Sequence, residues 1–293
     1  MFKFLIVGFG NMGKIHLDSL LRSKNTELYG VVDHKINKKN EEVNYFKSIY
    51  DVNLNDDIDA VIISSTTSSH YEIAKEIIKF NLPVLIEKPI STDINEVKKI
   101  VDLFIKKKQI LLTGFIELFN PVVSYLKSKE IKKISKIEIT RLGPVQDKSR
   151  ILDNVIYDLG IHDVSIFDFL FKLNKTEIIN RKHIYKDNMI AESEIQFNSN
   201  NIEANLKLSN QSNEKQRIWK IYSDKFVYEA DLLNRNLKIF HNEKIIEEIK
   251  FENYKDAIDL QLEDFVNKIN KKSYNSEHVN SILSVHKVVD DLN

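Results

Sequence analysis

The sequence of 293 residues contains no cysteine. This absence excludes disulfide bonds, cysteine nucleophiles, iron–sulfur clusters and cysteine-ligated zinc; only histidines and carboxylates could hold a metal ion, and we expect no metal site. No apolar run approaches the roughly 20 residues of a membrane-spanning helix. The apolar run at the N-terminus is too short for a signal peptide, and no small-residue cleavage site follows it. We therefore predict a cytoplasmic protein.

An excess of charge of one sign is also missing, because 43 basic residues balance 43 acidic ones. A protein that binds nucleic acid electrostatically needs a basic face, so this balance predicts no nucleic-acid partner. The lack of an apolar span likewise predicts no membrane partner. Glycine and proline are scarce, with seven and four residues, a bias that we attribute to genomic composition. The length suits one large domain or two of moderate size.

Up to about residue 115, short apolar runs alternate with segments whose apolar residues recur at helical spacing. The predicted strands are 2–7, 27–32, 60–64, 84–86 and 110–114, and the predicted helices are 14–23, 70–80 and 93–108. Strands that alternate with helices form βαβ units, which build a parallel sheet with helices on both faces. We predict a doubly wound α/β domain of the Rossmann type over residues 1–117.

After Pro121 the pattern changes to strands that follow one another at short spacing. The predicted strands are 136–141, 177–183, 193–197, 202–208, 218–223, 226–230, 237–240 and 244–249, and the predicted helices are 122–128, 155–170, 256–269 and 277–290. Successive strands with short connections are typical of an antiparallel sheet. We predict a second α/β domain over residues 118–293, with a mainly antiparallel sheet.

The segment Gly8-Phe9-Gly10-Asn11-Met12-Gly13 fits the pattern G-x-G-x-x-G between a strand and a helix. These glycines permit a tight turn, close approach to a pyrophosphate and close helix packing, and the helix start offers N–H groups to phosphates. Asp33, 20 residues after Gly13, would accept hydrogen bonds from the adenosine ribose and repel a 2′-phosphate. The motif predicts NAD, with NADP less favoured; the alternative is a tight turn with an incidental aspartate. The candidate cofactor contacts here are Gly8, Gly10, Asn11, Met12, Gly13 and Asp33.

Two further polar segments leave predicted strands at the carboxyl edge of the sheet, where open α/β sheets bind ligands. Glu87-Lys88-Pro89 follows an apolar strand, and a lysine fixed there by a proline is poorly explained as a solvated charge. A salt bridge between Lys88 and Glu87 is the alternative. The run 64–70 is a helix-capping loop that could also border a nicotinamide ribose. The candidate cofactor contacts in these segments are Ser65, Thr66, His70, Glu87, Lys88 and Pro89.

Asp158-Leu159-Gly160-Ile161-His162 places a carboxylate and an imidazole four residues apart. On an α-helix this spacing puts both side chains on one face. Oxidation of a hydroxyl needs a group that takes its proton, for which histidine is well suited near neutral pH. Lys88 could stabilise alkoxide character on the same oxygen. The alternative is a structural Asp–His pair; Asp163 and Asp168 look like solvated or capping residues.

In this order along the chain, the glycine motif with Asp33, the loop ending at His70, Glu87-Lys88-Pro89 and Asp158-x-x-x-His162 resemble the Gfo/Idh/MocA family of nicotinamide-dependent sugar and polyol oxidoreductases. The resemblance covers nearly the whole chain. It implies a Rossmann domain followed by an α/β domain with an open antiparallel sheet, through which a homo-dimer or homo-tetramer forms. It also implies that Lys88 is the catalytic lysine, that His162 is the acid–base residue and that Asp158 orients it.

Within the family, 114–121 and 141–144 look like members of surface-polysaccharide biosynthesis, of the UDP-N-acetylglucosamine 3-dehydrogenase type, which oxidise the ring of a nucleotide sugar. The resemblance thus implies an NAD-dependent dehydrogenase that moves hydride between a secondary hydroxyl of a sugar or nucleotide sugar and nicotinamide. An arginine fork would suit a diphosphate; the alternative for Arg141 and Arg150 is that each forms a surface ion pair. The candidate substrate contacts are Lys88, Asn120, Arg141, Arg150, Tyr157 and His162.

Two other functions remain open from the sequence. One is a reductase of a non-sugar carbonyl or unsaturated substrate on the same scaffold, of the biliverdin-reductase kind, although Lys88 stands where that group has tyrosine. The other is a regulator that binds NAD and a partner protein without catalysis. A regulator has no need of Lys88, Asp158 and His162, so their presence favours the enzyme. Turnover of the cofactor by the purified protein discriminates between the enzyme and the regulator.

Overall fold

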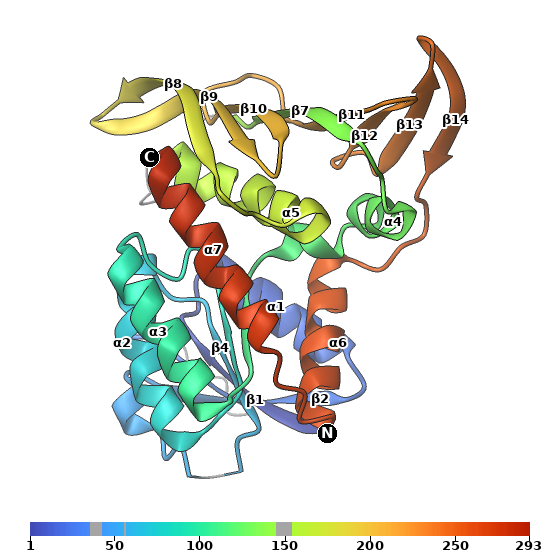
Figure 1. Cartoon of the computed structure of the whole chain (residues 1–293). Coiled ribbons are helices and arrows are strands. Elements are labelled where there is room, and N and C mark those ends of the chain that lie inside the picture. The colour runs from blue at the N-terminus through green and yellow to red at the C-terminus, as the bar shows by residue number, and fades with distance from the viewer. Residues whose placement is uncertain (36–42, 56, 145–153) are drawn as a thin grey trace. The chain divides into compact units, whose positions relative to one another are not determined.

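The computed structural model describes residues 1–35, 43–55, 57–144 and 154–293. These residues form two units; the colours of Figure 1 run with residue number along the chain. The first unit consists of Met1–Phe115 and Lys255–His286, and the second consists of Ile116–Tyr254 and Lys287–Asn293. Each unit is built on its own β-sheet.

The sheet of the first unit has six parallel strands in the order β3-β2-β1-β4-β5-β6. This is the strand order of a Rossmann fold, so the predicted fold class is confirmed. One strand, β3, is absent from the prediction; it is three residues long and pairs at the edge of the sheet with β2. The strands are β1 (Phe2–Val7), β2 (Thr26–Val32), β3 (Asn44–Phe46), β4 (Ala60–Ile63), β5 (Val84–Ile86) and β6 (Leu111–Thr113).

Helices α2 and α3 lie on one side of this sheet and α1 and α6 on the other (Figure 1). The sequence of α3 carries signals for both ends of a helix. At the start, the Asp93 carboxylate accepts the N–H of Asn95, and in the last turn lysines lie where cations are favoured. Its apolar residues recur on the face that is buried. The helices are α1 (Asn11–Arg22), α2 (Thr67–Ile77), α3 (Ile94–Lys107), α6 (Ala257–Asn270) and α7 (Ser276–Leu292), the last of which is shared with the second unit.

The chain returns to the first unit after the second sheet. On α6, Leu262, Phe265 and Val266 belong to the same core as Phe4 and Ile6 of β1, and the rings of Phe265 and Phe4 meet edge to face with centroids 5.9 Å apart. The predicted division assigned 118–293 to one domain, whereas the structure places the boundary at 115/116 and returns 255–286 to the first unit. The physical reason is that the apolar face of α6 packs on one face of the parallel sheet, against β1.

The second unit has an eight-stranded sheet in the order β14-β13-β12-β11-β7-β10-β9-β8. All neighbours are antiparallel except β7 and β10, which are parallel, so the predicted mainly antiparallel sheet is confirmed. Helix α4 (Pro121–Lys129) and helix α5 (Ile161–Phe171) belong to this unit. The strands are β7 (Ile134–Leu142), β8 (Glu177–Lys186), β9 (Met189–Ser199), β10 (Ile202–Ser209), β11 (Gln216–Ser223), β12 (Val227–Asp231), β13 (Asn236–His241) and β14 (Lys244–Lys250).

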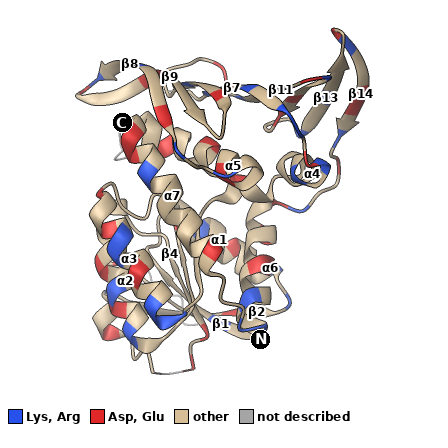
Figure 2. Ribbon diagram, in the orientation of Figure 1, with Lys and Arg blue, Asp and Glu red and all other residues tan. Residues whose placement is uncertain are grey.

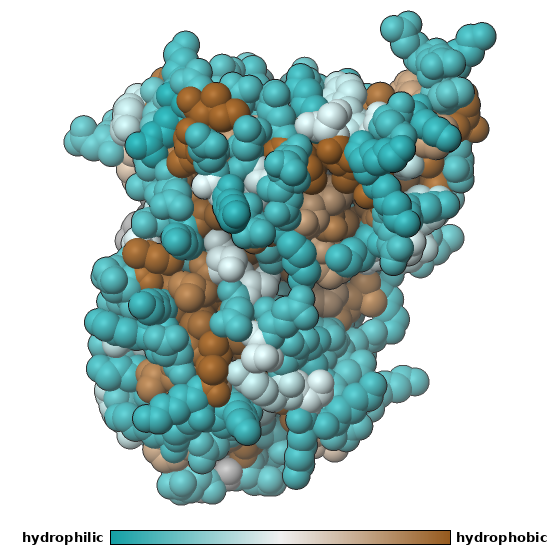
Figure 3. Space-filling view, in the orientation of Figure 1, coloured by the Kyte–Doolittle hydropathy of each residue, from teal (hydrophilic) through white to brown (hydrophobic). Residues whose placement is uncertain are grey.

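Charged residues of both signs are interspersed over the helices and strands of the two units (Figure 2). The face in Figure 3 is mostly hydrophilic, with apolar residues in separate patches. None of the helices in the described part of the chain combines the length and the apolar character that crossing a bilayer requires.

The contribution of α6 to the first unit can be tested at Phe265, which is fully buried. We expect Phe265→Ala to lower the free energy of unfolding by about 3–5 kcal/mol, because it removes a core aromatic ring and leaves a cavity. Urea denaturation followed by circular dichroism measures this loss. The matched control is Leu21→Ala on α1, whose side chain is 69% exposed; a change within about 0.5 kcal/mol is expected there. Equal effects of the two substitutions would contradict the core position of α6.

Candidate functional site

The glycine loop after β1 makes contacts that only glycine permits. Gly8 has a φ of +96°, and a Cβ built on it would lie 2.3 Å from the backbone nitrogen of Ser65. A Cβ on Gly13 would lie 2.2 Å from the carbonyl oxygen of Gly8, so α1 packs directly against the loop. On Gly10 a Cβ would meet no described atom within 4 Å, and no described side chain caps the start of α1. This open helix start fits the pyrophosphate of a dinucleotide.

Asp33 follows β2, and its carboxylate lies against the glycine loop. One oxygen accepts the N–H of Phe9 at 2.7 Å, and the other accepts the N–H of Lys35 at 2.8 Å. A carboxylate offers about four lone-pair positions, so these two bonds anchor Asp33 and leave positions for the hydroxyl groups of a ribose. That Asp33 binds the ribose stays a prediction.

The loop between β4 and α2 packs on the glycine loop. The Ser64 hydroxyl donates to the carbonyl oxygen of Gly8 at 2.8 Å. Thr66 is the N-cap residue of α2 and is exposed. His70 is buried, and its two ring nitrogens lie 2.9 Å from the carbonyl oxygen of Pro89 and 3.0 Å from that of Ser65. His70 therefore joins this loop to the Glu87-Lys88-Pro89 segment at the carboxyl edge of the sheet.

Glu87 is buried at the end of β5, and its partner is not the neighbouring lysine. Its Oε1 lies 2.7 Å from Nε2 of His16 on α1. Its Oε2 accepts the N–H of Lys88 at 3.3 Å and occupies a space that a Cβ on Gly114 would fill, at 2.4 Å. Burial raises the pKa of Glu87, but the hydrogen bond and charge of His16, with the charge of Lys88, outweigh it and hold this pKa below its usual value. Glu87 is therefore ionised, and His16 donates the hydrogen bond.

A second buried histidine contacts the residue after Pro89. Nδ1 of His286, on α7, lies 2.8 Å from the carbonyl oxygen of Ile282, and Nε2 lies 3.0 Å from the backbone nitrogen of Ile90. Because a carbonyl oxygen only accepts, Nδ1 carries the hydrogen and Nε2 accepts the N–H of Ile90. Burial lowers the pKa of His286 to about 4, so the ring is neutral near pH 7.

The sequence analysis did not identify His16 and His286. Each lies on the buried face of its helix, with Gly13 and Leu20 for His16 and with Ile282 and Val289 for His286. A histidine within a buried apolar stripe is the only sequence signal that could have identified them. The stripe does not indicate which segment the imidazole meets.

Asp158 and His162 lie in a helix that changes its type between them. Ile156–Gly160 forms a π-helical turn, and α5 begins at Ile161. The predicted spacing on one α-helix therefore does not describe the pair, because a π-helical turn contains more residues than an α-helical one. Both side chains are partly exposed. The hydroxyl of Tyr157, a predicted substrate contact, donates to Oδ1 of Asp290 at 2.9 Å.

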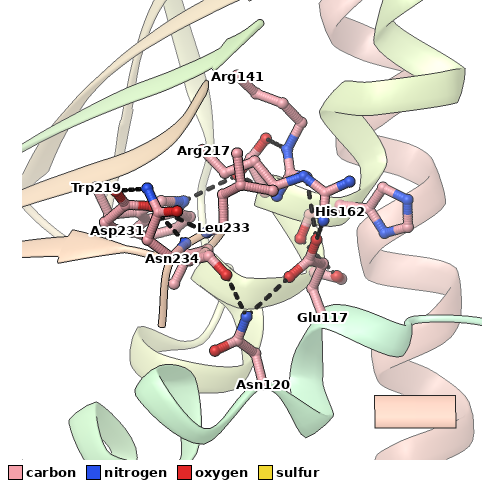
Figure 4. A network of polar contacts seen from close by, with 12 residues as sticks. Glu117, Asn120, Arg141, His162, Arg217, Trp219, Asp231, Leu233 and Asn234 are labelled. Carbon is pink, nitrogen blue, oxygen red and sulfur yellow. Dashed lines mark hydrogen bonds and ion pairs between the residues drawn. The ribbon is translucent and has the colours of Figure 1, made fainter. Parts of the chain in front are cut away.

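A buried ionic network underlies α5 in the second unit, and Figure 4 shows it with His162 beside it. Arg141 is 2% exposed; its Nε and Nη2 donate to the two carboxylate oxygens of Asp163 at 2.6 and 3.0 Å, and its Nη1 donates to Glu117 at 3.2 Å. Arg217 donates to the same oxygen of Glu117 at 2.6 Å. Asp163 also accepts the indole N–H of Trp219 at 2.9 Å.

This network corrects two sequence predictions. Arg141, predicted to contact substrate, is enclosed by carboxylates and has a structural role; Asp163, predicted to be solvated or a cap, is 1% exposed. Burial lowers the pKa of Arg141, but Asp163 and Glu117 outweigh it and raise this pKa further above its usual value. Burial likewise raises the pKa of Glu117, and the charges of Arg141 and Arg217 reverse this and lower it. Arg141 and Glu117 therefore stabilise each other's ionised form.

Asn120, another predicted substrate contact, also has a structural role. Its amide donates to the carbonyl oxygen of Leu232 at 2.9 Å, and its Oδ1 caps α4 by accepting the N–H of Val122 at 3.1 Å. Arg150 lies outside the described residues. Within the described ranges, no three histidine or carboxylate side chains gather in a way that could hold a metal ion. Lys88 belongs to the first unit and His162 to the second, so their joint action on one oxygen stays a prediction.

Residues 2–115 match the oxidoreductase family with an NAD-binding Rossmann fold, the Gfo/Idh/MocA family. The chain is 25% identical over 283 residues to UDP-N-acetylglucosamine 3-dehydrogenase of Acidithiobacillus ferrooxidans, covering 90% of this chain and 87% of that protein. It is 24% identical over 201 residues to myo-inositol 2-dehydrogenase of Thermotoga maritima, covering 64% of this chain and 60% of that protein.

Solved structures share the fold along nearly the whole chain. The A. ferrooxidans dehydrogenase superposes with a TM-score of 0.85 at 23% identity, covering 99% of this chain and 97% of that one. KijD10, a 3-ketoreductase from Actinomadura kijaniata, superposes with a TM-score of 0.87 at 13% identity, covering 99% and 96%. The resemblance to Gfo/Idh/MocA oxidoreductases, and within them to the UDP-N-acetylglucosamine 3-dehydrogenase, is therefore confirmed.

His286 should make the stability of the protein depend on pH. Its pKa is about 4 in the folded state and 6.5 as a model value, so between these two pH values only the unfolded state takes up the proton. The free energy of unfolding is therefore unaffected by this proton above pH 6.5. It decreases as the pH falls, by about 3 kcal/mol at pH 4. Urea unfolding across this range measures it. His286→Gln does not titrate and should show a shallower loss; equal slopes in both proteins would contradict the assignment.

Proposed function

We propose that this protein is a nicotinamide-dependent oxidoreductase that moves hydride between a secondary hydroxyl carbon of a sugar or nucleotide sugar and the cofactor, with a UDP-sugar as the favoured substrate. The observation that carries the proposal is the position of Lys88. It follows Glu87, which His16 holds against α1, the helix that starts at the glycine loop. The backbone of Lys88 is thereby held at the edge of the sheet that also carries the glycine loop. The similarity to a UDP-sugar dehydrogenase supports the substrate class.

The chain supplies the binding and proton-transfer groups for this reaction. The glycine loop and the start of α1 hold the pyrophosphate, and Asp33 binds the adenosine ribose. When bound, the nicotinamide would supply the acceptor for the hydride on the carbon that bears the hydroxyl group. The ammonium group of Lys88 donates a hydrogen bond to the reacting oxygen and stabilises its alkoxide character. His162 takes the hydroxyl proton, Asp158 orients the imidazole, and the substrate becomes a ketone.

The cofactor preference, the oligomeric state and the pathway that we propose follow from the family resemblance. NAD is favoured over NADP because the carboxylate of Asp33 would repel a 2′-phosphate. We further propose a cytoplasmic homo-dimer or homo-tetramer, joined through the eight-stranded sheet, that acts in surface-polysaccharide biosynthesis. Exposed apolar side chains on β8 and β14 support the sheet as an interface; they include Ile179, Ile184, Tyr185, Ile245 and Ile246.

The first test measures absorbance at 340 nm with NAD across UDP-sugars, free sugars and inositols, with and without 2-oxoglutarate to reoxidise bound cofactor. We expect turnover of a UDP-sugar and a fall of kcat of about 100-fold or more in Lys88→Met, because the reacting oxygen loses its charged donor. Lys98→Met, an exposed position on α3, is the matched control and should retain wild-type turnover.

Full activity of Lys88→Met would refute the role of Lys88. Turnover of polyols alone would keep the mechanism and remove the nucleotide-sugar assignment. Cofactor binding without any turnover would favour the non-catalytic regulator.

The cofactor preference can be tested at Asp33 with two substitutions. Asp33→Asn keeps an amide oxygen as acceptor for the N–H of Phe9 but removes the charge, and Asp33→Ser removes the charge and shortens the side chain. We expect each to raise the ratio of kcat/KM for NADP to that for NAD by about tenfold or more, because like-charge repulsion of the 2′-phosphate is lost. Calorimetric titration with each cofactor provides a second measure. An unchanged preference in both variants would contradict the assignment of Asp33.

A further inference from the structure

The four residues Glu87–Ile90 are contacted by three buried histidines from three different helices. His16 of α1 contacts Glu87, His70 of α2 contacts the carbonyl oxygen of Pro89, and His286 of α7 contacts the N–H of Ile90. Their relative exposures are 2%, 1% and 1%, so none of them is a surface group. In the proposed mechanism neither His16 nor His286 takes part in the chemical step.

His16 fixes the residue before Lys88. Its Nε2 donates to Oε1 of Glu87 at 2.7 Å, while Oε2 accepts the N–H of Lys88 itself. The bare Cα of Gly114 completes the space around the Glu87 carboxylate. The carboxylate thus has one position, and the backbone of Lys88 is bonded to it.

His286 fixes Ile90, two positions after Lys88. It does so as a hydrogen-bond acceptor, whereas His16 is a donor. Its Nδ1–H donates to Ile282 at 2.8 Å, which leaves Nε2 as the acceptor for the N–H of Ile90 at 3.0 Å. The ring of Phe115 lies 5.9 Å from that of His286, centroid to centroid. One histidine is therefore a donor and the other an acceptor, on either side of the same lysine.

We propose that His16 and His286 are positioning residues for Lys88, the first through the Glu87 carboxylate and the second through the N–H of Ile90. This inference rests on the proposed function, in which Lys88 acts on the reacting oxygen. Buried ionic contacts are a poor source of stability, because apolar groups of similar volume often serve as well. What the two polar contacts do supply is a single orientation of the backbone on both sides of Lys88.

The test compares glutamine and leucine at each position. The glutamine amide can donate to Glu87 in place of His16, and its oxygen can accept the N–H of Ile90 in place of His286, whereas leucine can do neither. We expect His16→Leu and His286→Leu to lower kcat by at least about tenfold, because small displacements of a reacting group are costly. His16→Gln and His286→Gln should stay within about threefold of wild type.

Two further measurements separate positioning from folding. Amide hydrogen exchange of the peptide covering 86–92 should show loss of protection in the leucine variants and retained protection in the glutamine variants, whether or not the protein turns over a substrate. In a Lys88→Met background, the leucine substitutions should have no further effect on the residual rate. Should His16→Leu fail to fold, His16→Asn, whose amide is too short to reach Glu87, replaces it.

The outcomes distinguish this inference from the proposed function. Equal kcat for the leucine and glutamine variants, or the same fold loss with and without Lys88, would overturn the positioning role. Unchanged hydrogen exchange in all four variants would also overturn it. Full activity of Lys88→Met would instead overturn the proposed function, and with it the role of both histidines in catalysis.

Discussion

The close packing of α1 against the glycine loop is the constraint on which the rest of the candidate site depends. Gly13 places its Cα where a Cβ would lie 2.2 Å from the carbonyl oxygen of Gly8, and the Ser64 hydroxyl donates to that oxygen. Because α1 is this close to the sheet, His16, one turn further along, reaches Glu87 at the end of β5. The glycine loop that is proposed to hold the pyrophosphate therefore also brings His16 against the carboxylate bonded to the N–H of Lys88. In the proposed function, cofactor binding and the positioning of Lys88 both depend on this one backbone contact.

In the second unit, the orientation of α5 is fixed by a buried ionic network. The carboxylates of Glu117 and Asp163 and the guanidinium groups of Arg141 and Arg217 compensate one another in the interior. Such a network adds little stability over apolar packing, but removal of one member leaves an uncompensated buried charge. It thereby specifies one rotation of α5, since Asp163 must face β7 and β11. His162 precedes Asp163, so the orientation of α5 that satisfies the network also determines the side on which the imidazole projects.

The sequence predicts the two sheets and most helices, because alternation and helical spacing are local signals. It does not predict that α6 packs on the first sheet, since an amphipathic helix carries no information about which sheet its apolar face covers. It predicts Arg141 as a substrate contact and Asp163 as a solvated or capping residue. Local patterns do not reveal that these two residues, 22 positions apart in the sequence, form a buried ion pair. The short edge strand β3 and the π-helical turn before His162 have no strong signal either. Gly8, Asp33 and Lys88 all lie in the first unit, and the sequence points to them because each belongs to a short local motif.

The two histidines around Lys88 also bear on the pH dependence of the site. The arrangement needs Glu87 ionised and His286 neutral. Burial alone would raise the pKa of Glu87, yet its partners lower it, and burial lowers the pKa of His286 to about 4. Both requirements are therefore met throughout the neutral range and fail only in acid. It follows that neither the Glu87 carboxylate nor the His286 ring accounts for a change of rate with pH near neutrality, for which His162 is the proposed base.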